Sequence, residues 1–112
     1  MGDAAARVVY EVNLDVDASI ADDYRAWLKG HIREILALPG FIGARLAQVD
    51  DPAAPSGRVA LCVQYTLRDA AALDAYLRDH APRLRAEGQA RFDGRFSAQR
   101  RVLRVVGDYD GA

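Results

Sequence analysis

Residues 7–16 read RVVYEVNLDV, and residues 58–67 read RVALCVQYTL. Valine stands at the second and sixth positions of both segments. Within each segment, the residues at alternate positions are apolar, which is the period of two expected of a strand with one buried face. The sequence therefore predicts two equivalent strands, one at the start of each half of the chain.

The segments that follow these strands also match each other. Residues 27–40 read WLKGHIREILALPG, and residues 76–88 read YLRDHAPRLRAEG. Apolar residues recur every three or four positions in both, as in an amphipathic helix, and the alignment pairs His31 with His80. Together with the strands, this predicts an internal repeat of strand, helix and strand. The two repeats span residues 7–49 and 58–106.

Local signals set the bounds of the expected helices. Ser19 and Asp69 have side chains that cap helix N-termini, and Pro39-Gly40 is typical of the residues that follow a helix. Pro82 lies inside the second helical pattern and has no backbone donor. We therefore expect the second helix to be broken or restarted near that residue.

The order of elements predicts an α+β, ferredoxin-like βαββαβ fold, with a four-stranded antiparallel sheet and two helices on one face. We expect a single domain over residues 7–106, with flexible termini at residues 1–6 and 107–112. The other face of the sheet has no cover. Two such faces packed together would form a dimeric α/β barrel, so we expect a homodimer through the open sheet face. A solvated outer face is the alternative.

Composition narrows the possible partners. The 112 residues are 51% hydrophobic, which is sufficient for one core without disulfides. Fifteen Lys and Arg residues against sixteen Asp and Glu give a net charge of −1, so nucleic acid is not an expected partner. No apolar run approaches the ~18 residues of a membrane span. The single cysteine, Cys62, is expected to be a buried thiol in a cytoplasmic protein.

The two histidines are the candidate catalytic residues. Histidine titrates near ~6.5 and can act as a base or an acid. His31 and His80 also lie on the apolar stripes of their helices, so a packing role in the core is the alternative. A metal site is not expected, because the histidines show no carboxylate or thiol at ligand spacing.

A second group of residues is interpreted as ligand-binding. Trp27 on the first helix could form the wall of an aromatic pocket, although aromatic residues at helical spacing often serve only the core. Arg45 and Arg100 are expected on the open face near Glu11, where either could hold a carboxylate or enolate. Glu11 itself could have a raised pKa and abstract a proton, or it could pair with these arginines. The ligand-binding candidates are Asn13, Trp27, Arg45, Tyr65 and Arg100.

The run YRAWLKGHIREILALPGF, residues 24–41, resembles the dimeric α/β-barrel superfamily, because a histidine is followed by an acidic residue, Leu-Pro-Gly and an aromatic residue. The segments HIREILALPGFIGARL, LCVQYT and HAPRLRAEGQARFDGRFSAQRRVL resemble more closely a small bacterial family known only as a domain of unknown function. The superfamily includes antibiotic-biosynthesis-type monooxygenases, EthD-like proteins, muconolactone-isomerase-like enzymes and haem-degrading monooxygenases. The resemblance implies a fold shared by several chemistries.

One comparison within the superfamily concerns haem. Haem-degrading members combine a strand asparagine, a strand tryptophan and a helix histidine, and Asn13 and His80 resemble two of these. The only tryptophan of this chain, Trp27, is on the first helix, and the second repeat has Tyr65 on its strand. We therefore expect no haem and no other cofactor.

The sequence supports two functional interpretations. The first is a homodimer that binds a small aromatic or carboxylated molecule between sheet and helices and is capable of cofactor-free oxygenase or isomerase chemistry. The second is a non-catalytic dimeric module, used for structure or interaction, in which the histidines serve the core. The residues alone do not decide whether the protein is an enzyme.

Overall fold

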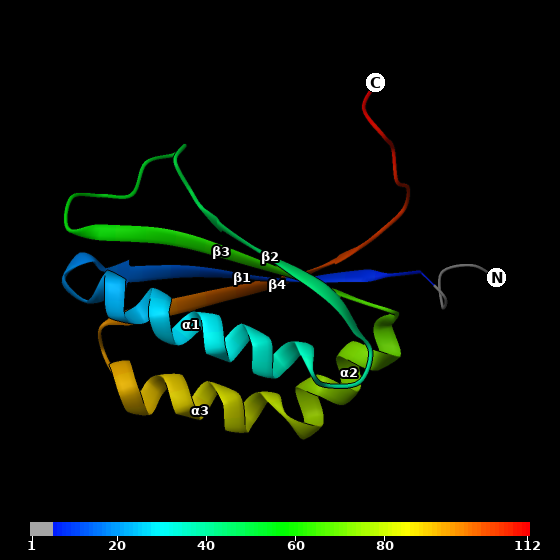
Figure 1. Cartoon of the computed structure of the whole chain (residues 1–112), viewed down its shortest axis with the longest axis horizontal. Coiled ribbons are helices and arrows are strands. Elements are labelled where there is room, and N and C mark those ends of the chain that lie inside the picture. Colours follow the sequence, from blue (N-terminus) through cyan, green and yellow to red (C-terminus); the bar gives the residue numbers. More distant parts are fainter. Residues whose placement is uncertain (1–5) are drawn as a thin grey trace.

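A computed structural model describes residues 6–112 and confirms the predicted α+β fold (Figure 1). The elements in chain order are β1 (Val8–Asp17), the 3-10 helix η2 (Ala18–Ile20), α1 (Ala21–Leu36), β2 (Phe41–Gln48), β3 (Arg58–Leu67), α2 (Ala70–Asp79), α3 (Ala81–Phe92) and β4 (Phe96–Arg104). The four strands form one antiparallel sheet in the order β2-β3-β1-β4. All three α-helices lie on the same side of this sheet.

The ends of the helices agree in part with the sequence signals. Asp69 caps α2 as predicted, since its side chain accepts a hydrogen bond from the backbone N–H of Ala72. The chain also breaks between α2 and α3, and Pro82 lies in the first turn of α3. Ser19 does not cap the first helix. Asp17 instead accepts a hydrogen bond from the Ser19 backbone and begins η2, which leads into α1.

The core lies between the sheet and the helix layer. The helix-facing side chains of β1 and β3 alternate with open-face ones, and the fully buried members include Val16, Val63 and Leu67. Gly40 allows the close turn from α1 into β2. Its φ is +88°, and a Cβ on it would overlap the Cβ of Ala72. The backbone can therefore pass close to α2 where it turns from α1 into β2.

The open face of the sheet has no helix over it. It carries side chains from all four strands, and Cys62, which was predicted to be a buried thiol, is half-buried there. The loop between β2 and β3 and the C-terminal segment both project to this side of the sheet (Figure 1). The two projecting segments border the open face from opposite ends.

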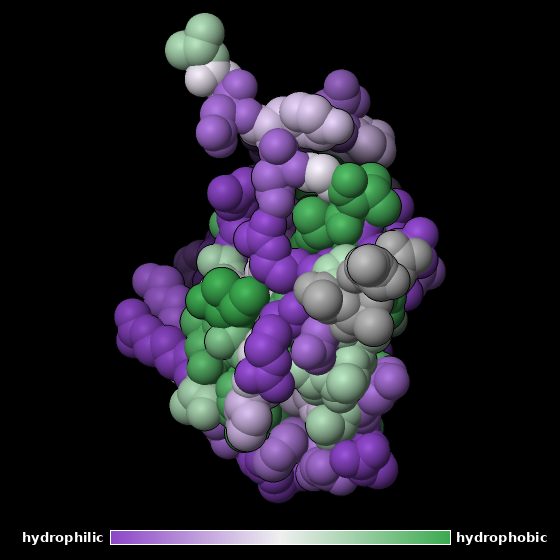
Figure 2. All heavy atoms as spheres, turned by 90° about the vertical axis from the view of Figure 1, so that its right-hand side faces the viewer, coloured by the Kyte–Doolittle hydropathy of each residue, from purple (hydrophilic) through white to green (hydrophobic). Residues whose placement is uncertain are grey.

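The C-terminal segment leaves the sheet beside the first strand. The backbone N–H of Val105 donates to the carbonyl of Arg7, and the Arg7 guanidinium forms an ion pair with Asp108. Val106 and Tyr109 are almost fully exposed, at 86% and 94%. Figure 2 shows this end of the molecule, with the C-terminal segment standing out from a surface of mixed apolar and polar patches. The predicted flexibility of residues 1–6 concerns a segment that, apart from Ala6, lies outside the described residues.

None of the helices within residues 6–112 is both long enough and apolar enough to cross a membrane.

Candidate functional site

A cavity of about 60 Å³ lies between the sheet and the three α-helices. Its floor comes from the helix-facing sides of β1, β3 and β4, and its walls come from α1, α2 and α3. The lining combines aliphatic side chains with aromatic and polar ones, and the aromatic and polar side chains supply the possible chemistry. The latter include Trp27, His31, Tyr65, Tyr76, Arg85 and Arg100.

Tyrosine side chains form one wall of the cavity. The ring centroid of Tyr10 is 6.1 Å from that of Tyr65 and 5.9 Å from that of Tyr76. Burial raises the pKa of Tyr76 to about 12 and raises that of Tyr65 further. These hydroxyls therefore stay protonated at neutral pH and can donate hydrogen bonds to a ligand.

Arg85 bridges the helix layer and the sheet at this wall. It lies on α3, is exposed, and donates a hydrogen bond of 2.8 Å from Nη2 to the hydroxyl of Tyr10 on β1. A long, flexible and exposed side chain can move away from the cavity at modest cost. The Arg85 side of the cavity is therefore the side through which a molecule could enter.

Trp27 and His31 face each other one turn apart on α1. Their rings are stacked, with centroids 4.5 Å apart and planes inclined by 21°. Burial lowers the pKa of His31. Its Nδ1 is buried and is the one buried side-chain nitrogen or oxygen within residues 6–112 that has no hydrogen-bond partner. Buried polar atoms are nearly always paired, so this nitrogen has unused bonding capacity.

Arg100 supplies a positive charge to the cavity. It lies opposite Val12 in the β1–β4 pairing, which places it on the helix-facing side of the sheet rather than on the predicted open face. Its charge lowers the pKa of His31, Tyr24, Tyr65 and Tyr76, although burial remains the main effect on each. No carboxylate within the described residues forms a salt bridge with Arg100.

Gly88 makes room for the indole of Trp27. It is buried on α3, and a Cβ on it would lie 3.1 Å from Cη2 of Trp27 and 3.5 Å from Cζ of Phe96. A larger residue would push α3 away from α1 or turn the indole. The distance between the helices at the cavity thus depends on a glycine that the sequence patterns did not single out.

Glu11 lies on the opposite, open face, as predicted, and forms an ion pair there. It is only 4% exposed and accepts hydrogen bonds from Arg101, Gln64 and Asn13 at 2.6, 2.9 and 2.9 Å. These bonds, led by the one from Arg101, lower the pKa of Glu11 to about 2. Of the two alternatives for Glu11, the raised pKa is wrong and the ion pair is found, with Arg101 as the partner rather than Arg45 or Arg100. Glu11 is a fully ionised structural group and not a base.

The structure brings four of the seven predicted site residues together. Trp27, His31, Tyr65 and Arg100 all line the cavity. The other three lie elsewhere.

Asn13, Arg45 and His80 do not reach the cavity. The Asn13 amide donates to Glu11 on the open face, where Arg45 also lies opposite Gln64. His80 occupies the break between α2 and α3, and its Nδ1 is 3.3 Å from Nη2 of Arg83. Asn13 and His80 are thus on different sides of the sheet, so the haem-type combination of residues is not assembled.

Several cavity residues were missed from the predicted site. Tyr10 could have been found, because it is a hydroxyl-bearing residue among valines on the inward face of the first strand. Tyr76 holds the position in the second repeat that matches Trp27, and both residues line the cavity. Arg85 and Gln89 carry no such signal, since they lie on α3 among many charged residues.

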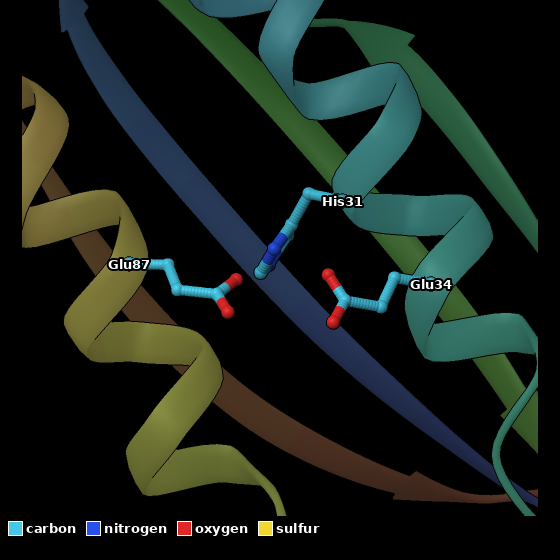
Figure 3. Close-up of side chains that lie close together, drawn as sticks. All are labelled: His31, Glu34 and Glu87. Atoms are coloured by element: carbon cyan, nitrogen blue, oxygen red, sulfur yellow. The ribbon is translucent and has the colours of Figure 1, made fainter.

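Two carboxylates lie close to His31, contrary to the expectation that none would. Figure 3 shows Glu34 on α1 and Glu87 on α3 extending toward each other, with the His31 ring between them. One ligand atom from each of the three residues lies within 4.8 Å of the others. Glu34 follows His31 by three positions, which is one helical turn, whereas the approach of Glu87 depends on the packing of α3 beside α1.

Comparison with protein families identifies the chain. Residues 7–106 match the model of a family described as a domain of unknown function, DUF4286. The chain belongs to the DUF4286 family. Comparison of this DUF4286 chain with curated proteins gave no significant match.

Solved structures similar to this DUF4286 protein share its fold at low sequence identity. The haem degrader MhuD from Mycobacterium tuberculosis is 19% identical with a TM-score of 0.64, over 92% of this chain and 99% of that chain. SnoaB, a cofactor-independent oxygenase from Streptomyces nogalater, is 12% identical with a TM-score of 0.62, over 93% and 97%. A candidate antibiotic biosynthesis monooxygenase from Bacillus cereus is 11% identical with a TM-score of 0.65, over 95% and 99%.

These likenesses confirm the predicted ferredoxin-like fold. At such identities they establish the fold alone, and site chemistry has to be argued from the residues of this chain.

Proposed function

We propose that the protein binds a small carboxylated molecule in the cavity between its sheet and its helices. The observation that carries the proposal is Arg100, a guanidinium without a carboxylate partner among the described residues, beside an aromatic cavity. Guanidinium groups bind carboxylates in a two-pronged geometry, through charge-assisted hydrogen bonds. Arg100 would hold the carboxylate, while the tyrosine rings would contact the rest of the ligand.

The size of the cavity limits the ligand. A cavity of about 60 Å³ is smaller than the ~150 Å³ void that admits a benzene ring. A porphyrin does not fit in such a space. A three-carbon acid needs little rearrangement, whereas an aromatic acid requires exposed side chains such as Arg85 and Gln89 to swing outward.

The same cavity supports proton-transfer chemistry at the ligand. Because burial lowers the pKa of His31, its imidazole is mainly neutral at pH 7 and can accept a proton. Removing a proton from the carbon next to a carbonyl leaves the electron pair on an enolate, which Arg100 would stabilise. Returning the proton to another carbon completes an isomerisation. Reaction of the enolate with dissolved O₂ would instead begin cofactor-free oxygenation.

We also propose that the protein is a homodimer joined through its open sheet face. The β2–β3 loop and the C-terminal segment border this face, and Ile42 and Val106 expose apolar surface at 59% and 86%. A second copy seated between the two projecting segments would cover these side chains and close a barrel.

Trp27 offers a direct test of ligand binding, because it is the only tryptophan and lies in the cavity wall. Pyruvate and benzoate would be titrated while tryptophan fluorescence is recorded, with EDTA present. Saturable quenching is expected for the wild type and for Arg45→Gln, and at least tenfold weaker binding for Arg100→Gln. Equal binding by Arg45→Gln and Arg100→Gln would contradict the proposal.

The alternative of a non-catalytic dimeric module is favoured by one observation, the small volume of the cavity. In that case neither acid would change the fluorescence of Trp27. His31→Ala would then lower stability by about 2 to 4 kcal/mol through lost packing, without affecting any binding.

A further inference from the structure

A cluster of one imidazole and two carboxylates lies where α1 and α3 face each other. His31 and Glu34 come from α1 and Glu87 comes from α3 (Figure 3). Both glutamate side chains are about half exposed, at 47% and 45%, whereas Nδ1 of His31 is buried and without a partner. Ions from solvent can therefore reach the carboxylates, and the imidazole has a nitrogen that is not used in hydrogen bonding.

The donor atoms suit a divalent transition metal. Imidazole nitrogen and carboxylate oxygen are both ligands of Zn²⁺, at about 2.0 to 2.2 Å. Three ligands around one ion lie roughly 3.4 Å apart in tetrahedral geometry. The donor atoms here lie within 4.8 Å of one another, so shifts of about 1 Å would bring them to the metal. The exposed glutamate side chains can make such shifts by changing rotamer.

Arg83 forms ion pairs with both carboxylates. Its Nη1 is 3.2 Å from Oε2 of Glu34 and 3.9 Å from Oε1 of Glu87, and its side chain is 51% exposed. The same guanidinium contacts Nδ1 of His80 through Nη2. Because exposed ion pairs contribute little, about 0 to 1 kcal/mol each, Arg83 can be displaced by a more strongly bound cation.

We propose that His31, Glu34 and Glu87 bind a divalent transition metal, with Zn²⁺ as the reference ion, in competition with the guanidinium of Arg83. The three residues leave a fourth position for water, as in metal sites with three protein ligands. The proposal is independent of the carboxylate proposed for the cavity, although both involve His31. A metal on the imidazole would occupy a lone pair that could otherwise accept a proton, so ligand binding is measured with EDTA present.

Isothermal titration of metal-free protein with ZnCl₂ tests this inference. One Zn²⁺ per chain is expected for the wild type, with at least tenfold weaker binding for Glu34→Gln and Glu87→Gln. Arg83→Gln should bind Zn²⁺ several-fold more tightly, because the competing cation is gone. His80→Gln is the matched control, since it removes the other histidine, and should bind within twofold of the wild type. Circular dichroism would confirm that each variant is folded.

Three outcomes would overturn the metal site. They are no stoichiometric Zn²⁺ binding by the wild type, unchanged affinity in both glutamine variants, and loss of affinity in His80→Gln equal to that in Glu87→Gln. A tighter Arg83→Gln together with weaker glutamate variants would establish the site and the competition. Failure of the metal titration leaves the fluorescence response of Trp27 to carboxylates unaffected, so the two proposals are tested separately.

Discussion

Arg100 and Arg101 are adjacent in β4, yet their side chains lie on opposite faces of the sheet. Arg100 lines the cavity under the helices, whereas Arg101 forms an ion pair with the buried Glu11 on the open face. This follows from the alternation of side chains along a strand. The two faces therefore differ in charge. Among the described residues, Arg100 has no salt bridge on the helix-facing side, whereas Arg101 and Glu11 form an ion pair on the open face.

Substitution of Arg100 should affect ligand binding, whereas substitution of Arg101 should affect the free energy of unfolding. Arg100→Gln should weaken carboxylate binding, measured by Trp27 fluorescence, at least tenfold and change the free energy of unfolding by less than about 1 kcal/mol. Arg101→Gln should leave binding intact and lower stability by about 1 to 3 kcal/mol, because it removes a charged partner of a buried carboxylate. Fluorescence titration and urea unfolding measure the two effects. Equal loss of binding in both variants would contradict the assignment of faces.

The stability of the protein should depend on pH through Glu11. Its folded pKa of about 2 lies below the ordinary value of 4.5, so the folded state binds this proton more weakly than the unfolded state. The stabilisation is present above pH 4.5 and is lost as the pH falls toward 2. Urea midpoints of wild type and Glu11→Gln should therefore differ most at pH 7 and converge in acid. A difference that stays constant with pH would exclude this role.

Gly40 should tolerate alanine much less well than Gly57 does. Both glycines have positive φ, at +88° and +82°, so alanine strains the backbone at either position by about 1 to 2 kcal/mol. A Cβ at Gly40 also overlaps Ala72, while a Cβ at Gly57 has no heavy atom within 4 Å. Thermal unfolding should show Gly40→Ala losing at least about 1 kcal/mol more stability. Similar losses of stability in Gly40→Ala and Gly57→Ala would contradict this prediction, because they would mean that α2 shifts at little cost to make room for the Cβ.

The open face can be tested as a dimer interface by placing a charge on it. Ala60 and Cys62 both lie on the open face of β3, so Ala60→Arg and Cys62→Arg should convert a dimer into monomers. Ala26→Arg, on an exposed position of α1, is the control and should remain dimeric. Sedimentation velocity reports the assembly. Dimers that persist in both open-face variants would place the interface elsewhere.

The fold could be predicted because periodicity is a local property of the sequence. Each of the signals that predicted it involves residues only a few positions apart. They are the alternating residues of β1 and β3, the cap at Asp69 and the break at Pro82. The prediction that Ser19 caps the first helix was wrong. The side chain of Asp17, two residues earlier, forms the capping hydrogen bond instead. Neighbouring polar residues of similar capping strength cannot be ranked by pattern alone.

The candidate site was only partly predictable, because it depends on strand register and on helix packing. A shift of one residue decides whether Arg100 or Arg101 enters the cavity, and the sequence of β4 is too polar to reveal its inward face. Glu87 approaches His31 only because Gly88 lets α3 pack against Trp27. Contacts between segments that are far apart in the chain cannot be predicted from the spacing of residues within each segment.

The most direct measurement of the central claim is native mass spectrometry of wild type, Arg100→Gln and Arg45→Gln, each with excess pyruvate and without it. We predict dimers of the wild type and of Arg45→Gln that carry one small acid per chain, and dimers of Arg100→Gln that carry none. Bare chains for all three proteins, or an adduct that survives in Arg100→Gln, would contradict a carboxylate site at Arg100.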